Sequence, residues 1–306
     1  MVISMVVEKY NNFSVFKEND KSVFIHLNID SDSFYDDLIA FFFSEEKILG
    51  YISNKTNIVF QAKLEQFVSL YKALSSFIDD ENLEIDINDL KKELSNYIDW
   101  EKYTEDELLT LRRDKIGKVG EYILHNILAD YFKFSCVLPK LSLTTNKNMS
   151  VYGIDVVFWS MENEMLLFGE SKVSKNLDNG IRLINDSLSK YEHQIFEEYR
   201  TLLSNQLLNL NLPDSIKEYI GKAVNFKKFI TIANIKTIGI PIFIMNGYDM
   251  DVKEILNKLN KIQKIQIQDL NIKYYIINLP IIDKNIFQSK IINYLRERCD
   301  YYESKC

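Results

Sequence analysis

The hydrophobic pattern is clearest along residues 151–173, where two runs rich in β-branched and aromatic side chains flank a short polar stretch. The two runs are Val151–Trp159 and Met165–Val173. This pattern predicts an antiparallel β-hairpin. If the turn is symmetric, Asp155 lies opposite Glu170. Lys172 then shares the face of Glu170, because side chains alternate along a strand.

On either side of this hairpin, the pattern predicts strands alternating with helices. In an N-terminal α+β region, residues 1–100, the expected strands are Val2–Val7, Phe13–Phe16 and Val23–Leu27, and the expected helices are Ser33–Phe43 and Ile58–Asp79. In residues 101–306, the expected helices are Glu105–Phe132, Ile181–Leu208, Asp251–Leu259 and Ile286–Tyr302, and the further strands are Phe226–Ala233, Ile238–Met245 and Ile272–Leu279. This alternation is typical of an α/β fold with a mixed central sheet flanked by helices. Pro241 indicates an edge strand or a bulge.

Glu121 is the informative residue of the helix that precedes the hairpin. It shares a helical face with Leu124 and Leu128, so its carboxylate is expected to point into the protein. A buried carboxylate is costly unless it is paired or bound to a metal. Gly117 and Gly120 would let the helix approach the sheet closely. Glu121 is therefore either a structural residue paired with a lysine or a third acidic residue beside the two hairpin carboxylates.

Two carboxylates on facing strand positions repel each other, with Cβ atoms about 4.5–5.5 Å apart. A divalent cation with oxygen ligands would relieve this repulsion, and such a group suits metal-dependent phosphodiester hydrolysis. We expect Mg²⁺, or Mn²⁺ in its place, held by Asp155, Glu170, Glu121 and the main-chain carbonyl of Ser171. Lys172 would orient or help deprotonate the attacking water, or stabilise the transition state. The alternative is a surface hairpin with a plain Glu–Lys pair.

Basic and polar side chains outside this group are candidates for contact with a phosphate backbone. The main candidates are Arg112, Arg113, Lys140 and Arg182, with His193, Gln194 and Arg200 as weaker ones. Clusters of this kind are more often solvated surface. His125, on the helix of Glu121, is expected to be a core or rim histidine.

The composition of the chain is that of a globular protein, with 46% hydrophobic and 26% charged residues among 306. Its net charge of −7 argues against tight, unaided binding to nucleic acid, so a partner should share that task. Three cysteines without metal-ligand spacing argue against a disulfide framework and fit a reducing cytoplasm. We expect neither a secretion signal nor a membrane span, since the longest apolar stretch, Leu38–Phe43, is too short.

An aspartate followed on the next strand by Glu-x-Lys is the pattern of the PD-(D/E)xK nuclease superfamily. The motifs that accompany it are Gly120-Glu121, Gly153-Ile154-Asp155, Gly169-Glu170-Ser171-Lys172 and Asn176…Gly180-Ile181. With these motifs the chain resembles the HamA family, the nuclease subunits of the Hachiman anti-phage defence system. The similarity is strongest over residues 105–205.

That resemblance implies a restriction-endonuclease-like core that cleaves DNA with Mg²⁺. It places Glu121, Asp155, Glu170 and Lys172 at the positions of the catalytic motif. It also implies a helicase partner, HamB, which restrains the nuclease until foreign or damaged DNA is met.

Two other readings stay open at this point. The first is an RNase, or a nuclease of another defence or restriction system with the same core. The second is a non-catalytic subunit that only regulates a helicase. The sequence has no recognisable zinc finger or helix-turn-helix, so a nuclease of this kind should be non-specific or guided by DNA structure.

Overall fold

The structure is a computed structural model of the chain. It describes residues 6–10, 13–17, 22–26, 34–53, 63–78, 88, 91, 99–102, 104–105, 116–138, 153–204, 212–223, 225–247, 251–281 and 284–306. Of the expected elements, the first half of the helix over Glu105–Phe132 lies mostly outside these residues.

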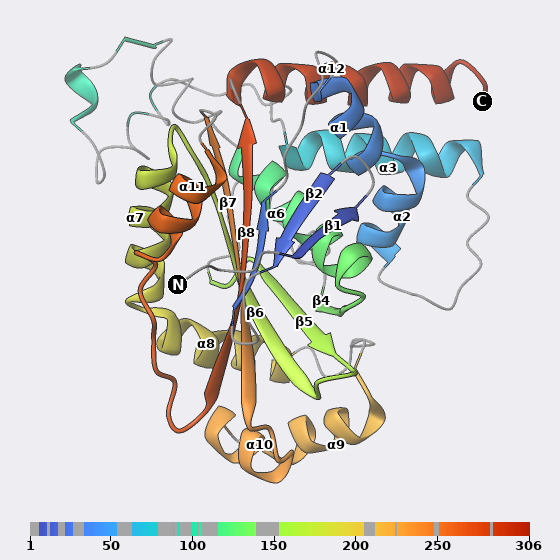
Figure 1. Ribbon diagram of the computed structural model, residues 1–306. Helices are drawn as coiled ribbons and strands as arrows, with labels where there is room; N and C mark the ends of the chain where they lie inside the picture. Colours follow the sequence, from blue (N-terminus) through green and yellow to red (C-terminus); the bar gives the residue numbers. More distant parts are fainter. Residues whose placement is uncertain are drawn as a thin grey trace.

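A six-stranded mixed sheet forms the centre of the protein (Figure 1). In spatial order its strands are β3 (Ser22–His26), β8 (Asn271–Ile281), β7 (Thr237–Gly247), β6 (Met165–Ser174), β5 (Val156–Ser160) and β4 (Ser135–Leu138). The first four are parallel, and β5 and β4 run antiparallel to their neighbours. A separate two-stranded ladder joins β1 (Val6–Tyr10) to β2 (Phe13–Lys17).

Helices cover both faces of the sheet, so each face has its own hydrophobic core. On one face lie α1 (Phe34–Phe42), α2 (Glu45–Ser53), α3 (Leu64–Ile78), α6 (Ile116–Asn126) and α12 (Lys284–Glu303). On the other lie α7 (Leu177–Leu188), α8 (Tyr191–Ser204), α9 (Asp214–Lys222), α10 (Phe226–Ile232) and α11 (Val252–Leu259). Short helical turns occur at Trp100–Lys102 and Ile127–Tyr131. This architecture confirms the predicted α/β fold with a mixed sheet flanked by helices.

Alternation along β6 shows how one strand serves both cores. Met165 and Leu167 point into the core under α6 and α12, whereas Leu166 and Phe168 point into the core under α7 and α8. A strand buried on both faces is apolar at nearly every position. Polar side chains within such a strand therefore stand out, and Glu170 is the first that follows this apolar run.

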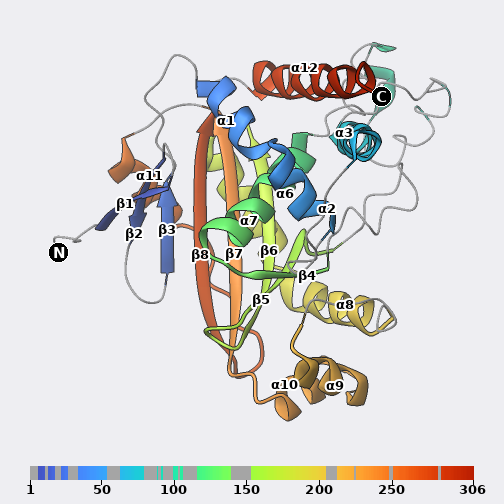
Figure 2. The ribbon, with the colours of Figure 1, turned by 90° about the vertical axis from the view of Figure 1, so that its right-hand side faces the viewer.

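The N-terminal region packs into the main body of the protein. Strand β3 pairs with β8 at the edge of the sheet, and α1, α2 and α3 share a core with α6 and α12. Figure 2 shows α12 across one end of the sheet with α3 beside it. Residues before and after the predicted boundary at residue 100 thus contribute to one sheet and one core.

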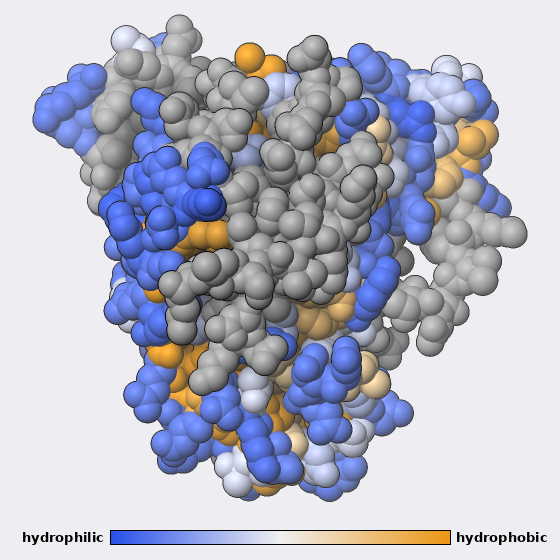
Figure 3. All heavy atoms as spheres, in the orientation of Figure 1, coloured by the Kyte–Doolittle hydropathy of each residue, from blue (hydrophilic) through white to orange (hydrophobic). Residues whose placement is uncertain are grey.

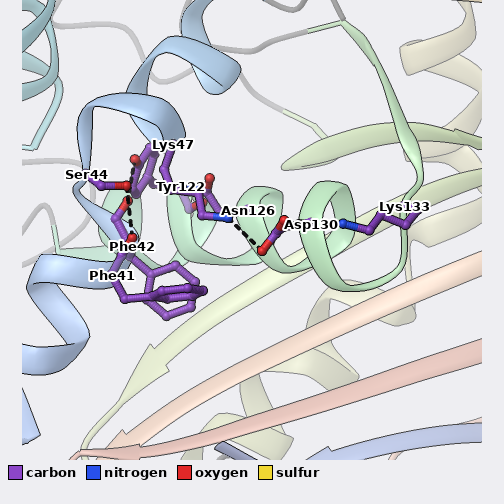
Figure 4. A network of polar contacts seen from close by, with 8 residues as sticks. All are labelled: Phe41, Phe42, Ser44, Lys47, Tyr122, Asn126, Asp130 and Lys133. Carbon is purple, nitrogen blue, oxygen red and sulfur yellow. Dashed lines mark hydrogen bonds and ion pairs between the residues drawn. The ribbon is translucent and has the colours of Figure 1, made fainter. Parts of the chain in front are cut away.

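Polar contacts tie α1 and α2 to helix α6 and to the helical turn that follows it (Figure 4). The buried hydroxyl of Tyr122 donates a hydrogen bond of 2.7 Å to the carbonyl of Phe42. Lys47 forms an ion pair of 2.6 Å with Asp130. These contacts fix α6, the helix that carries Glu121, against the N-terminal region.

The single helix predicted over Ile181–Leu208 is wrong, because two helices occupy this segment. Helix α7 already begins at Leu177, before the predicted start at Ile181. It is capped by Asn176, whose side chain accepts a hydrogen bond of 2.9 Å from the amide of Asn179. The chain then turns after Leu188, and α8 begins at Tyr191. No glycine or proline marks this turn, so hydrophobic periodicity alone runs through it.

The strand predicted over Phe226–Ala233 is also wrong, because this segment is helix α10. Its buried residues Phe226, Phe229 and Ile230 follow helical spacing, and Asn225 caps the first turn. A short apolar run of this length fits either structure, and here the cap decides.

Pro241 was expected at an edge or a bulge, yet β7 lies inside the sheet between β6 and β8. The register with β6 is the same before Pro241, at Leu167↔Gly239, and after it, at Glu170↔Ile242. A Cβ atom added to Gly169 would lie 3.4 Å from the ring of Pro241. The absent side chain of Gly169 therefore leaves room for a proline in a central strand.

On the face shown in Figure 3, hydrophilic residues cover most of the described surface. Hydrophobic residues reach this surface in small separate areas between them. The described part of this face therefore has the mixed character usual for a protein surface.

We predict that Tyr122→Phe lowers the free energy of unfolding by about 1–2 kcal/mol, because it leaves the buried carbonyl of Phe42 without its donor. Chemical denaturation measures this difference. Tyr301→Phe is the matched control, since Tyr301 is 44% exposed, and it should change stability little. Equal effects of the two substitutions would contradict a structural role for the Tyr122 hydroxyl.

Candidate active site

Asp155 and Glu170 are the residues next to the last pair of the β5–β6 ladder, Val156↔Gly169. The pairing Val156↔Gly169 and its continuation give the register predicted from the symmetric turn. The amide of Asp155 donates a hydrogen bond of 3.0 Å to the carbonyl of Gly169. Because Gly169 is already paired with Val156, this bond makes Gly169 the neighbour of two residues of the other strand, and the regular register ends before Asp155.

The side chain of Asp155 also bonds to the backbone of β6. Its Oδ2 atom accepts a hydrogen bond of 2.7 Å from the amide of Ser171. In an extended strand the N–H and C=O of one residue point to the same edge. The carbonyl of Ser171 therefore faces the side of the strand where Asp155 lies, as a ligand role for it would require.

Glu170 and Lys172 form an ion pair on β6, between Oε1 and Nζ. Glu170 is buried, with 3% of its surface exposed. Its second oxygen, Oε2, is also buried and has no hydrogen-bond partner among the described residues. A buried carboxylate oxygen without a donor is costly, so this atom is available for a ligand.

The charge on Lys172 is stabilised by its surroundings. Burial lowers the pKa of its ammonium group, but the carboxylates around it, led by Glu170, outweigh burial and raise the pKa above its usual value. Lys172 is therefore a hydrogen-bond donor and a positive charge at neutral pH.

The negative charge of Asp155, by contrast, is destabilised by its surroundings. Burial, followed by the negative charges of Glu121 and Glu170, raises the pKa of Asp155 well above its usual value. The charge of Lys172 and the hydrogen bond from Ser171 act against this shift but do not cancel it. The site thus holds more negative charge than its own lysine compensates.

Glu121 approaches this group from α6, on the other face of the sheet. Its side chain is 13% exposed and pairs with Lys118 at 2.7 Å. It acts on the ionisation of both Asp155 and Lys172. Glu121 is therefore close enough to the hairpin residues to influence their ionisation, and it also has the lysine partner of the structural alternative.

A close approach of α6 to β6 makes this possible. A Cβ atom added to Gly120 would lie 2.5 Å from Oγ of Ser171 and 2.9 Å from a methyl group of Val173. Any side chain at residue 120 would therefore push the helix away from the sheet. The same role expected for Gly117 is wrong, because an added Cβ there meets nothing within 4 Å.

Most of the residues predicted to contact phosphate lie outside the part of the chain that the structure describes. Arg112, Arg113 and Lys140 lie outside the described residues. Arg182 is exposed on α7, where it binds Asp186 at 2.9 Å and the side chain of Asn179 at 3.0 Å. Its partners are thus neighbours on its own helix.

The residues present fit a hard divalent cation. The donors are carboxylate oxygens and a main-chain carbonyl, their net charge is negative, and Glu170 has a free buried oxygen. Within the described chain, no three His, Cys, Asp or Glu side chains form a ready metal cage. Each of the three carboxylates instead has a partner. Glu121 pairs with Lys118, Glu170 pairs with Lys172, and Asp155 accepts a hydrogen bond from the amide of Ser171.

His125 is a core histidine, as expected. It is buried and packs edge-on against Tyr51 and Phe158, with ring centroids 4.6 and 5.1 Å away. Burial lowers its pKa to about 3. His125 is therefore neutral and takes no part in proton transfer near pH 7.

Two residues on α8 near the site were not singled out by the sequence. Tyr191 is buried and donates a hydrogen bond of 2.7 Å to the carbonyl of Phe168, two residues before Glu170. Glu198 is buried, and its Oε2 lies 3.2 Å from where a Cβ atom of Gly153 would stand. Tyr191 and Glu198 are seven residues apart, which places both on the apolar side of a helix, and this spacing could have indicated them in the sequence.

A family model for HamA matches residues 5–295. The chain belongs to the HamA family. This confirms the resemblance drawn from the hairpin and helix motifs, and it assigns this HamA-family chain to Hachiman anti-phage defence. The match begins at residue 5, so it includes the N-terminal region. No curated protein matches the sequence. In the described part of this HamA-family chain, every helix is too short or too polar to span a lipid bilayer.

We predict that Asp155→Asn stabilises the metal-free protein at pH 8 by about 0.5–2 kcal/mol, because it removes a buried charge that Glu121 and Glu170 repel. Asparagine keeps an oxygen for the amide of Ser171. The folded-state pKa of Asp155 is raised, so its ionisation destabilises the fold progressively as pH rises above the unfolded value. The gain should therefore shrink at pH 4.5. Denaturant unfolding in EDTA at both pH values tests this, and a loss of stability at pH 8 would contradict it.

We also predict a pH effect from His125. Its folded-state pKa, about 3, lies below the unfolded value near 6.5, so acidification favours the unfolded chain across that interval. Between pH 7.5 and pH 4.5, the His125→Phe variant should therefore lose roughly 2 kcal/mol less stability than wild type. Denaturation at the two pH values measures it. The exposed His193→Phe is the control and should keep the wild-type loss.

Proposed function

We propose that this HamA-family chain is a metal-dependent DNA nuclease, the effector of a two-component anti-phage defence system. The observation that carries the proposal is the closeness of Asp155, bonded to the amide of Ser171, to Glu170, with one buried Glu170 oxygen lacking a donor. Lys172 beside them supplies a positive charge that its surroundings stabilise. Glu121 adds a third carboxylate from a separate helix.

In this proposal Asp155, Glu170 and the carbonyl of Ser171 hold Mg²⁺, or Mn²⁺ in its place, and Glu121 completes the set directly or through water. The ion would neutralise charge that develops on the scissile phosphate. Family membership supports the assignment to defence, and the acidic donor set supports the choice of metal.

Lys172 would act through its ammonium group. It can donate hydrogen bonds to the attacking water and to a non-bridging phosphate oxygen. The oxygen of that water bonds to phosphorus, the bond from phosphorus to one sugar oxygen breaks, and that sugar oxygen takes up a proton as the water loses one. Glu170, paired to Lys172, holds the ammonium group in place.

We further propose that a helicase partner, HamB, restrains the nuclease and delivers DNA to it in the cytoplasm. The net charge of −7 supports this division of labour, because a chain of that charge attracts DNA poorly by itself. The basic candidates for DNA contact remain Arg112, Arg113, Lys140 and Arg182.

The proposal predicts that Glu170→Gln and Lys172→Met each reduce cleavage at least about 100-fold, because each removes a charge that acts on the reacting phosphate. The full chain is incubated with Mg²⁺ or Mn²⁺ and matched DNA and RNA, alone and with the helicase. Chelation of the metal by EDTA should abolish cleavage.

Exposed residues of the same hairpin region provide matched controls. Glu162→Gln at the hairpin tip and Lys175→Met after β6 should leave cleavage and phage protection unchanged. If the protein cleaves RNA in preference to DNA, its substrate is RNA. Full protection and cleavage by both the Glu170 and Lys172 variants would instead favour a non-catalytic regulator of the helicase.

A further inference from the structure

The hydroxyl of Ser171 is an unused polar group in the candidate site. Its Oγ atom is buried and has no hydrogen-bond partner among the described residues. Buried polar atoms are nearly always bonded in folded proteins, and the exceptions call for an explanation such as a catalytic role or a bound ligand. The proposed metal site uses the amide and the carbonyl of Ser171 but gives its hydroxyl no task.

Strand alternation directs this hydroxyl toward helix α6. Because side chains alternate along β6, Ser171 points to the face opposite its two neighbours on the strand. Val173 points the same way and packs against the core that α6 shares. Oγ of Ser171 lies only 2.5 Å from where a Cβ atom of Gly120 would stand. The hydroxyl therefore lies directly against α6, beside the residue that precedes Glu121.

The carboxylate of Glu121 reaches the surroundings of Ser171 from the same part of α6. Its negative charge acts on the ionisation of Asp155 and Lys172. Both of these residues adjoin Ser171, since Lys172 follows it on the strand and Asp155 accepts a hydrogen bond of 2.7 Å from its amide. Glu121 and the unused hydroxyl therefore lie at the same junction of α6 and β6.

In the structure Glu121 is engaged with Lys118. The ammonium group of Lys118 donates to both carboxylate oxygens, at 2.7 and 3.0 Å. A cation bound by Glu121 would repel this ammonium group and loosen the pair. The side chain of Lys118 is 22% exposed, so water can replace the carboxylate at small cost. The carboxylate then needs another donor, and a serine hydroxyl is a neutral donor that a cation does not repel.

We propose that Ser171 is a positioning residue of this site, whose hydroxyl donates a hydrogen bond to the carboxylate of Glu121 when Glu121 leaves Lys118 and joins the metal site. This rests on the proposed nuclease function. A carboxylate has about four lone-pair positions, so it can accept this bond and still bind a cation. The hydroxyl thus fixes the direction in which Glu121 presents its remaining lone pairs.

The test compares Ser171→Ala with wild type in the full chain. Alanine removes a hydroxyl that has no partner in the metal-free protein, so the thermal midpoint in EDTA should not fall. The MgCl₂ concentration that produces half of the maximal midpoint shift should rise about 10-fold, because a hydrogen bond to a charged group is lost. The MgCl₂ concentration for half-maximal DNA cleavage should rise by a similar factor.

A double-mutant cycle shows whether the hydroxyl acts through Glu121. In the Glu121→Gln background the charged acceptor is absent, so adding Ser171→Ala should change the MgCl₂ requirement less than about 2-fold. A serine with a merely structural role would have the same effect in both backgrounds.

Ser160→Ala is the matched control from the same hairpin. The side chain of Ser160 is also buried, but its hydroxyl accepts hydrogen bonds from the amide and the side chain of Asn163, at 3.3 and 2.9 Å. This variant should show the opposite behaviour, with a lower midpoint in EDTA and the wild-type MgCl₂ requirement.

Three results would each overturn the role of Ser171 while the nuclease assignment stands. They are a lower midpoint of Ser171→Ala in EDTA, an unchanged MgCl₂ requirement, and an equal effect in the Glu121→Gln background. A wild type whose midpoint does not respond to MgCl₂ and which cleaves no nucleic acid, alone or with the helicase, overturns the proposed function and this role together.

Discussion

The structure is organised around the burial of negative charge between β5 and β6. Asp155 and Glu170 lie next to the last pair of the β5–β6 ladder, beyond the apolar run of β6. Lys172 and the amide of Ser171 offset part of this repulsion, and the raised pKa of Asp155 shows that a part is left over. Residues at functional sites commonly hold such unfavourable charge, because a substrate or a cation relieves it.

The surrounding elements hold this charge in place. Helix α6 lies so close to β6 that residue 120 has no room for a side chain, and this closeness brings Glu121 to the hairpin. On the opposite face Tyr191 binds the backbone of β6. Two helices thus fix the hairpin from both sides.

Much of this arrangement follows from periodicity. A symmetric turn sets the register of the hairpin up to Val156↔Gly169, and alternation along the strand places Glu170 and Lys172 on one face from the sequence alone. Helical spacing does the same for Glu121. In both cases the pattern is long, regular and bounded by clear polar signals, and these are the conditions in which periodicity determines structure.

The rest depended on contacts that periodicity does not encode. The apolar run of α10 fits a strand or a helix equally. The break between α7 and α8 contains no proline or glycine, so the sequence does not indicate it. Because that division sets the direction of α8, the approach of Glu198 to Gly153 could not be anticipated. The partners of each carboxylate likewise depend on distances between elements remote in the sequence.

The hydroxyl of Tyr122 has a mechanical consequence. Tyr122 is bonded to the turn after α1, and the adjacent residue, Glu121, belongs to the candidate site. A helix transmits displacement along its length with little deformation. Because Glu121 and Tyr122 are adjacent on α6, any displacement of the α1–α2 turn that moved Tyr122 would also move a carboxylate of the site.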